Sequence, residues 1–208
     1  MSPAAEPPEE QSPGDRPPED QPGDAAPRPL RSDAAANAER VLAAAIRTGL
    51  NEGRHVPLAQ IAKEAGVGVG TLYRRYPSRE ALLEALQVRA YGLLIGLAEQ
   101  ALASAATGRE AVGQFLTASY AVRDQLVLPL HGAPWTGDPE SARGRARLRE
   151  LMTGIVRRGH QDGTIRADVS AWTVVRFGAM LAQPLPSGPI QDDGAAEQRR
   201  IFLRGISV

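Results

Sequence analysis

The sequence predicts an all-α protein, with a small helical N-terminal unit joined by a long helix to a larger helical C-terminal unit. From residue 33 onward, apolar residues recur at spacings of three and four, as they do on one face of a helix. No stretch alternates between apolar and polar residues in the manner of a strand, and breaks rich in glycine and proline separate the periodic segments. The 208 residues are enough for one or two domains with a buried core.

The composition excludes several classes of protein. There is no cysteine, which rules out disulfides, thiolate metal sites and cysteine nucleophiles. The three histidines form no metal-binding pair, and we expect neither metal nor cofactor. The 24 basic residues balance the 24 acidic ones, so only a local basic patch is available for nucleic acid. No stretch approaches a membrane span and no signal peptide is evident, so we expect a cytoplasmic protein without membrane contact.

Residues 1–31 differ from the rest of the chain and predict a disordered tail. They hold nine of the 17 prolines, and seven acidic residues against three arginines. Such a segment has too little apolar surface to offset the entropy lost on folding. The alternative is an interaction arm with polyproline character.

A first helix is expected over residues 33–52. Ser32 or Asp33 is suited to cap it, and Gly53 follows its last turn. Its apolar residues share one face and are Ala38, Val41, Leu42, Ala45, Ile46 and Leu50.

Residues 57–76 predict two short helices that pack across each other. The first runs over 57–65 with a proline in its first turn, and the second over 69–76. Gly66 allows the chain to turn between them. Ala62 is small where the second helix crosses, and Leu72 belongs to the shared core. This arrangement is typical of a helix-turn-helix.

The outward face of the second short helix has the chemistry of a DNA reader. It carries Thr71, Tyr73, Arg74 and Arg75, and Arg79 follows at the start of the next helix. Arginine forms paired hydrogen bonds with guanine in the major groove, while hydroxyl groups and helix N-termini contact phosphates.

The remaining pattern predicts helices to the end of the chain. The helix over 79–103 would be about 37 Å long and would tie the two units together. Four further helices are expected over 109–126, 140–160, 168–183 and 194–205. On the helix over 168–183, the predicted buried side comprises Val174, Val175, Phe177, Met180 and Leu181.

Residues 33–94 resemble the TetR-type helix-turn-helix domain of bacterial transcriptional regulators. The likeness is carried by Ile61-Ala62, Ala65-Gly66-Val67, Gly70-Thr71-Leu72-Tyr73, Tyr76 and Ser78-Arg79-Glu80-Ala81-Leu82-Leu83. The resemblance implies a homodimer that binds a palindromic operator. It further implies a repressor that leaves DNA when a small-molecule effector enters the C-terminal domain, here residues 95–208.

The resemblance also assigns the DNA contacts by position. They are Val69, Gly70, Thr71, Tyr73, Arg74, Arg75 and Arg79. Two positions depart from the family pattern, because Gly68 and Pro57 stand where relatives often carry a hydroxyl residue. Two phosphate contacts would then be missing, and DNA affinity would depend more on the arginines.

In the C-terminal domain, several large side chains are candidates for an effector pocket, although helical spacing places most of them in a core or a dimer seam. They are Phe115, Tyr120, Trp135, Met152, Trp172, Phe177 and Met180. Dimerisation is expected through the helices over 168–183 and 194–205, paired with their copies as a four-helix bundle.

Two alternatives stand beside a ligand-responsive repressor. One is a constitutive DNA-binding factor without a ligand, which a solid C-terminal core would favour over an enclosed cavity. The other is an all-helical enzyme or small-molecule carrier. Since the sequence has no nucleophile elbow, phosphate-binding loop, paired-carboxylate frame or metal set, we expect no enzymatic activity.

Overall fold

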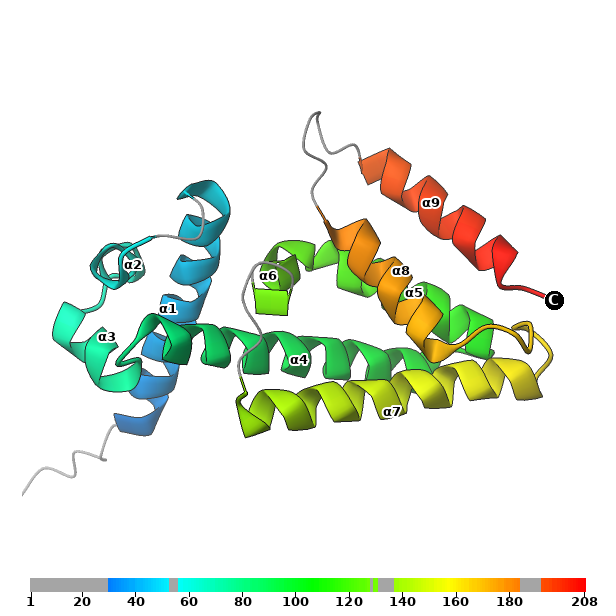
Figure 1. The fold of residues 1–208 in the computed structure, drawn as a ribbon, viewed down its shortest axis with the longest axis horizontal. Coiled ribbons are helices and arrows are strands. Elements are labelled where there is room, and N and C mark those ends of the chain that lie inside the picture. Colours follow the sequence, from blue (N-terminus) through cyan, green and yellow to red (C-terminus); the bar gives the residue numbers. More distant parts are fainter. Residues whose placement is uncertain (1–29, 53–55, 128, 131–136, 184–191) are drawn as a thin grey trace, which may run out of the picture.

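The computed structural model describes residues 30–52, 56–127, 129–130, 137–183 and 192–208. Within these ranges the regular structure is helical and contains no strand, so the all-α prediction is confirmed (Figure 1). The helices are α1 (Leu30–Glu52), α2 (Leu58–Ala65), α3 (Val69–Arg75), α4 (Arg79–Ser104), α5 (Gly108–Ala121), α6 (Arg123–Val127), α7 (Pro139–Gln161), α8 (Ala171–Ala182) and α9 (Asp192–Gly205).

The N-terminal unit consists of α1, α2, α3 and the first turns of α4, which share one hydrophobic core. The helix α1 begins at Leu30, so Ser32 and Asp33 lie within it and do not cap it, contrary to the prediction. The predicted disordered tail overlaps α1 at its last two residues, and its first 29 residues lie outside the described ranges.

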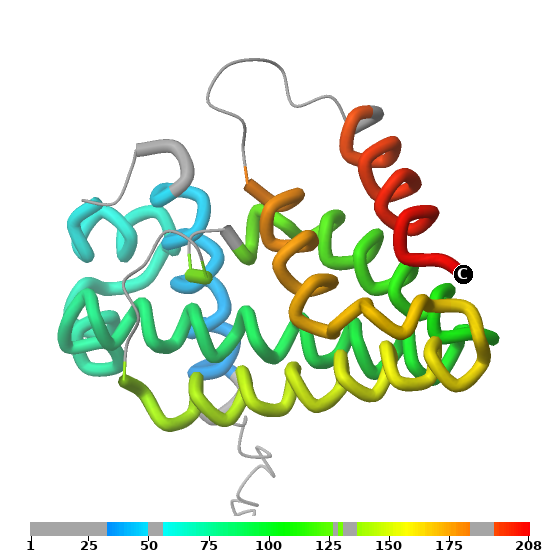
Figure 2. Tube along the Cα trace, turned by 45° about the vertical axis from the view of Figure 1, so that its right-hand side comes forward, coloured from blue at the N-terminus to red at the C-terminus, as the bar shows by residue number. Residues whose placement is uncertain are grey.

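The long helix α4 joins the two units. Its 26 residues place Leu82 and Leu86 in the N-terminal core, and Leu94 and Ala98 in the C-terminal one. By length and composition alone α4 could cross a membrane, which the sequence reading did not anticipate. Part of its apolar surface is used in packing within the protein, because α4 lies along α5 and α7 (Figure 2).

The C-terminal unit is a helical bundle around α4, α5 and α7. The helix α8 packs on α5 and α7, and α9 packs on α5. The single helix predicted over 109–126 is divided into two. The Val122 amide donates a hydrogen bond to the Ser119 carbonyl, and α5 ends there. A short α6 follows, and it contacts both α1 and α8.

At the end of the bundle farthest from α3, the start of α5 lies directly on the last turn of α7 (Figure 1). A Cβ atom added to Gly108 would overlap the Gly159 amide nitrogen. The neighbouring Arg158 donates hydrogen bonds to the carbonyls of Leu102, Ala105 and Ala106, which closes the end of α4. Only glycine fits at this backbone crossing.

The G108A substitution is therefore expected to destabilise the protein by about 1–3 kcal/mol, because the added methyl group meets backbone that cannot rotate away. The matched control is G154A on α7, where an added Cβ has no neighbour within 4 Å. Since alanine is favoured over glycine inside a helix, G154A should leave the stability unchanged or raise it by up to about 1 kcal/mol. Urea unfolding measures both, and equal stability of the two variants would contradict the crossing.

The same end of the bundle is held by a carboxylate. Asp162 accepts hydrogen bonds from the Gly108 amide at 2.7 Å and from the Thr164 amide at 3.0 Å. The hydroxyl of Thr164, and then the Gly108 amide, lower the pKa of the Asp162 carboxyl from its ordinary value of 3.8. Its ionised form therefore favours the folded state at neutral pH.

The D162N variant should accordingly be less stable than the wild type at neutral pH, because its amide nitrogen cannot accept from Gly108. Because folding lowers the pKa of Asp162, its carboxylate stabilises the folded protein above pH 3.8. This stabilisation is lost as the pH falls through the folded-state pKa. Melting temperatures measured across this range should converge for the two proteins in acid. A constant difference down to the lowest pH would contradict this role for the charge.

Candidate nucleic-acid interface

A tight glycine turn sets the direction of α3. Gly66 ends α2 with φ 65° and ψ 36°, in the left-handed region that glycine adopts at little cost. The Val67 amide donates to the Ala62 carbonyl at 3.0 Å, which satisfies the end of α2. Pro57 is the N-cap of α2 and not part of its first turn, and neither Pro57 nor Gly68 supplies a side-chain cap.

The inner side of α3 is buried as the sequence predicted. Leu72 is 1% exposed, and Tyr76, which follows the helix, is also buried. Both belong to the N-terminal core together with Ile61 and Ala62, and Ala62 is fully buried. A larger residue at position 62 would have no space beneath α3.

The outer side of α3 presents the predicted DNA-contact residues to solvent. The exposed residues are Val69, Gly70, Thr71, Tyr73, Arg74 and Arg75. Arg74 donates to the Thr71 hydroxyl at 3.1 Å, and the Arg75 guanidinium lies 5.9 Å from the centre of the Tyr76 ring. Among the described residues, no carboxylate forms an ion pair with Arg74 or Arg75.

Arg79 differs from the other predicted contacts because it is partly buried. Its Nη1 atom donates to the Val56 carbonyl at 2.9 Å, which ties the start of α4 to the segment before α2. Ser78 caps α4 by accepting from the Ala81 amide at 3.2 Å. The sequence gives no signal for the bond between Arg79 and Val56, since the two residues are 23 positions apart.

An acidic residue lies beside this arginine. The amide of Glu80 itself, and next the Ser78 hydroxyl, lower the pKa of the Glu80 carboxyl below its ordinary value. Glu80 is therefore ionised at neutral pH and offsets the charge of Arg79. The positive face of the interface is consequently concentrated on Arg74 and Arg75.

The candidates for an effector pocket do not gather in one place. Phe115 and Met152 are buried in the C-terminal core, and Tyr120 is buried beneath the guanidinium groups of Arg123 and Arg199. Trp135 lies outside the described residues.

Two other candidates on α8 face outward. Trp172 is 65% exposed and Met180 is 70% exposed. The prediction that Met180 lies on the buried side of its helix is wrong, because the buried positions of α8 are Val174 and Ala182. The outward side of α8 is therefore also apolar.

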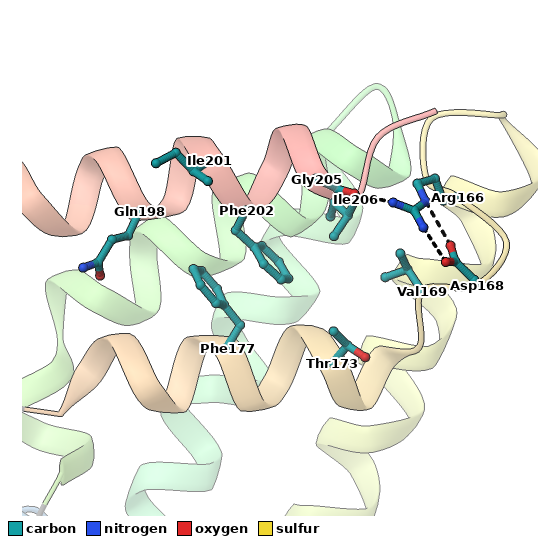
Figure 3. Close-up of a pocket in the computed structure, with 10 residues that line it drawn as sticks. All are labelled: Arg166, Asp168, Val169, Thr173, Phe177, Gln198, Ile201, Phe202, Gly205 and Ile206. Atoms are coloured by element: carbon teal, nitrogen blue, oxygen red, sulfur yellow. Dashed lines mark hydrogen bonds and ion pairs between the residues drawn. The ribbon is translucent and has the colours of Figure 1, made fainter.

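Two grooves open on the outside of the C-terminal unit. The first, of about 550 Å³, lies between α8 and α9, where the rings of Phe177 and Phe202 stack 3.9 Å apart (Figure 3). The second, of about 710 Å³, lies among α4, α5 and α9, and includes Leu97, Gln114 and Leu203 in its walls. Both grooves are open to solvent.

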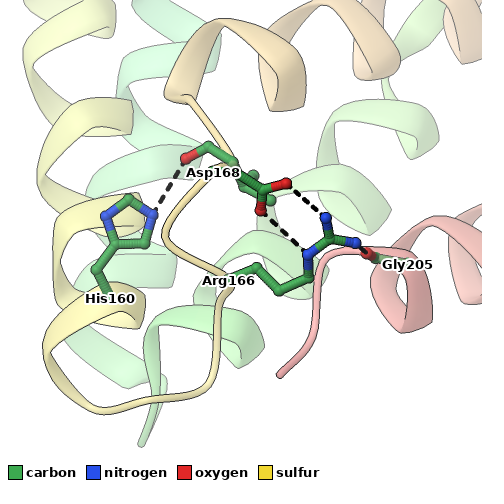
Figure 4. Close-up of polar contacts among 5 residues, drawn as sticks. His160, Arg166, Asp168 and Gly205 are labelled. Atoms are coloured by element: carbon green, nitrogen blue, oxygen red, sulfur yellow. Dashed lines mark hydrogen bonds and ion pairs between the residues drawn. The ribbon is translucent and has the colours of Figure 1, made fainter.

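A polar cluster borders one end of the first groove (Figure 4). Arg166 pairs with Asp168, and this hydrogen-bonded pairing lowers the pKa of the Asp168 carboxyl. Arg166 also donates to the Gly205 carbonyl at 3.1 Å, so it links the turn before α8 to the end of α9. His160 lies 3.1 Å from the Val169 carbonyl.

Comparisons with known proteins agree with the geometry of α2 and α3. Residues 41–86 match the sequence model of a family described as bacterial regulatory proteins, tetR family. No curated protein matches the chain.

Several solved structures are similar over most of the chain. A TetR transcription regulatory protein from Mycobacterium vanbaalenii is 28% identical, with 86% of this chain and 100% of that chain covered at a TM-score of 0.62. A TetR transcriptional regulator from Streptomyces coelicolor is also 28% identical. This match covers 82% of this chain and 98% of that chain at a TM-score of 0.61. A regulatory protein in the tetR family from Rhodococcus RHA1 shares the fold at 20% identity, with 82% and 96% covered and a TM-score of 0.65.

The first two of these proteins are described as transcriptional regulators, and the family match includes all of α2 and α3. On this evidence residues 41–86 carry the sequence pattern of the tetR family of bacterial regulatory proteins, and the chain is similar over most of its length to transcriptional regulators of that family.

Proposed function

We propose that this regulator is a homodimeric, sequence-specific repressor that binds a palindromic operator and leaves it when a small-molecule effector binds. The observation that carries the proposal is the exposed outer face of α3, where Arg74 and Arg75 have no carboxylate partner among the described residues. Residues 33–94 would bind DNA, and residues 95–208 would dimerise and bind the effector. The protein would act in the bacterial cytoplasm, where its DNA lies.

The contacts divide by chemistry. Arg74 and Arg75 suit guanine edges in the major groove, and the Thr71 methyl group suits a thymine. The Tyr73 hydroxyl suits a phosphate, while Val69 and Gly70 allow close approach of the backbone at the start of α3. Arg79 would use the guanidinium nitrogens that do not bind Val56 to contact a phosphate.

The R75A variant should bind the selected operator more weakly by about 1–3 kcal/mol if Arg75 reads a base. The control is R149A, which removes an exposed arginine from α7 and should leave affinity unchanged. Fluorescence anisotropy on the operator and on single-base variants measures both. An equal loss on every sequence would make Arg75 a phosphate contact, and no loss would remove it from the interface.

The dimer proposal rests on the outward faces of α8 and α9. Trp172, Met180 and Ile201 are each more than half exposed there. Large apolar side chains gathered on one face of a monomer mark a protein interface. Pairing α8 and α9 with their copies would bury them in a four-helix bundle and hold two α3 helices about 34–36 Å apart, or one DNA turn more.

A W172E substitution should weaken the dimer by about 2 kcal/mol or more, because it places a charge where a large aromatic side chain would be buried. Analytical ultracentrifugation should show monomers at concentrations where the wild type is dimeric. The control is A103E, which adds the same charge at an exposed position near the end of α4. An unchanged dimer in W172E would exclude α8 from the interface.

One observation favours the alternative of a DNA-binding factor without an effector. Phe115 and Met152 are buried in the C-terminal core, and both grooves are open to solvent at its surface. Selection of bound sites from random DNA, repeated with candidate effectors, tests both functions. If no sequence is enriched, the repressor proposal fails. An enriched site whose binding no compound changes would favour the constitutive factor.

A further inference from the structure

The acidic N-terminal segment has no part in the function proposed above, yet its charge is opposite to that of α3. We propose that residues 6–24 bind the exposed arginine side of α3 and compete there with DNA phosphates. The competition part of this inference rests on the proposed function, since it needs α3 to be the DNA-binding helix.

The charges of the segment and of α3 are complementary. Residues 6–24 contain one arginine, Arg16, and seven acidic residues: Glu6, Glu9, Glu10, Asp15, Glu19, Asp20 and Asp24. Several arginines elsewhere already face carboxylates, in the pairs Arg47–Glu64, Arg89–Glu39, Arg147–Glu99, Arg166–Asp168 and Arg200–Glu197. Within the described part of the chain, Arg74 and Arg75 have no such pair, so their face of α3 retains its positive charge for a mobile anion or an acidic peptide.

The segment enters the fold near α3. The segment joins α1 at Leu30, and in both views α1 begins at the side of the N-terminal unit where α3 and the start of α4 lie (Figures 1 and 2). Asp24 is only six positions before Leu30, and six residues of extended chain span at most about 20 Å. The remaining acidic residues precede it and have a longer reach. The carboxylates can therefore meet α3 of their own subunit without any rearrangement of the helices.

Tethering makes weak ion pairs between the segment and α3 effective. A single exposed ion pair contributes little, but several pairs formed by a tethered segment benefit from a high effective concentration. Proline fixes φ and so reduces the entropy lost when a chain is laid on a surface, and residues 1–29 contain nine prolines. The contact is expected to be weak, sensitive to salt and displaced by a good DNA site.

The consequence is a lower affinity for all DNA. When the segment occupies α3, the protein cannot bind DNA. The apparent DNA affinity is therefore reduced in proportion to the fraction of molecules whose α3 is unoccupied. This factor is the same for operator and random DNA. Random DNA, which binds more weakly, is lost first at a given protein concentration, while the operator remains occupied.

A spin label tests the contact without DNA. Because the chain has no cysteine, S12C in the full-length protein carries one nitroxide group. Amide NMR signals of Gly70 and Arg75 should broaden at low salt, while that of Arg157 on α7 should not. The broadening should disappear at about 0.5 M salt, where the Debye length is short. Equal broadening at all three positions, or none at α3, would overturn the proposal.

A charge-neutral segment tests the competition. The full-length variant E6Q/E9Q/E10Q/D15N/E19Q/D20N/D24N should bind random-sequence DNA about tenfold more tightly than the wild type at about 50 mM salt, because it has no carboxylates to compete for α3. The matched control keeps all seven acidic residues but permutes their positions among residues 6–24, and it should behave as the wild type does.

The arginines complete the test. In the background R74A/R75A, neutralising the segment should no longer raise the affinity. The same affinity for the neutral variant and the wild type would overturn the competition. If neither protein bound DNA while the α3 signals still broadened, the proposed function would fail and the contact between the segment and α3 would stand.

Discussion

The structure depends on the burial of one side of α3 by Leu72 and Tyr76 against α2. A helix of seven residues is too short to be stable alone in water, so α3 exists because the N-terminal core holds it. The same contacts determine which residues face outward, since side chains three or four positions apart share a side of a helix. The exposure of Tyr73, Arg74 and Arg75 is therefore a consequence of core packing.

The parts of this arrangement that depend on local sequence could be predicted. Gly66, Ala62 and Leu72 occupy the expected places, because turn chemistry and helical spacing act over only a few residues. The exposure of the α3 face followed in the same way. The bond from Arg79 to Val56 could not be predicted, because it joins distant positions through the packing of three helices. The DNA contacts remain a proposal, since the family match concerns the fold of the segment and not its bound state.

The C-terminal unit was less predictable for a physical reason. The helix α8 is apolar on two sides, and an apolar residue has the same pattern in a sequence whether it meets its own chain or another molecule. Val174 meets its own core, whereas Trp172 and Met180 are left on the surface. The break at Val122 also had no sequence signal, because valine does not mark the end of a helix in the way that glycine or proline does.

The helix α4 has a mechanical consequence, because it contributes side chains to both hydrophobic cores. Because each half of α4 is packed in one of the two cores, the helix connects the two units as a rigid rod. Over its length of about 39 Å, a tilt of about 5° moves one end by about 3 Å relative to the other. A repacking of the C-terminal unit too small to change its overall shape would thus be amplified into a visible displacement of the helices that precede α4.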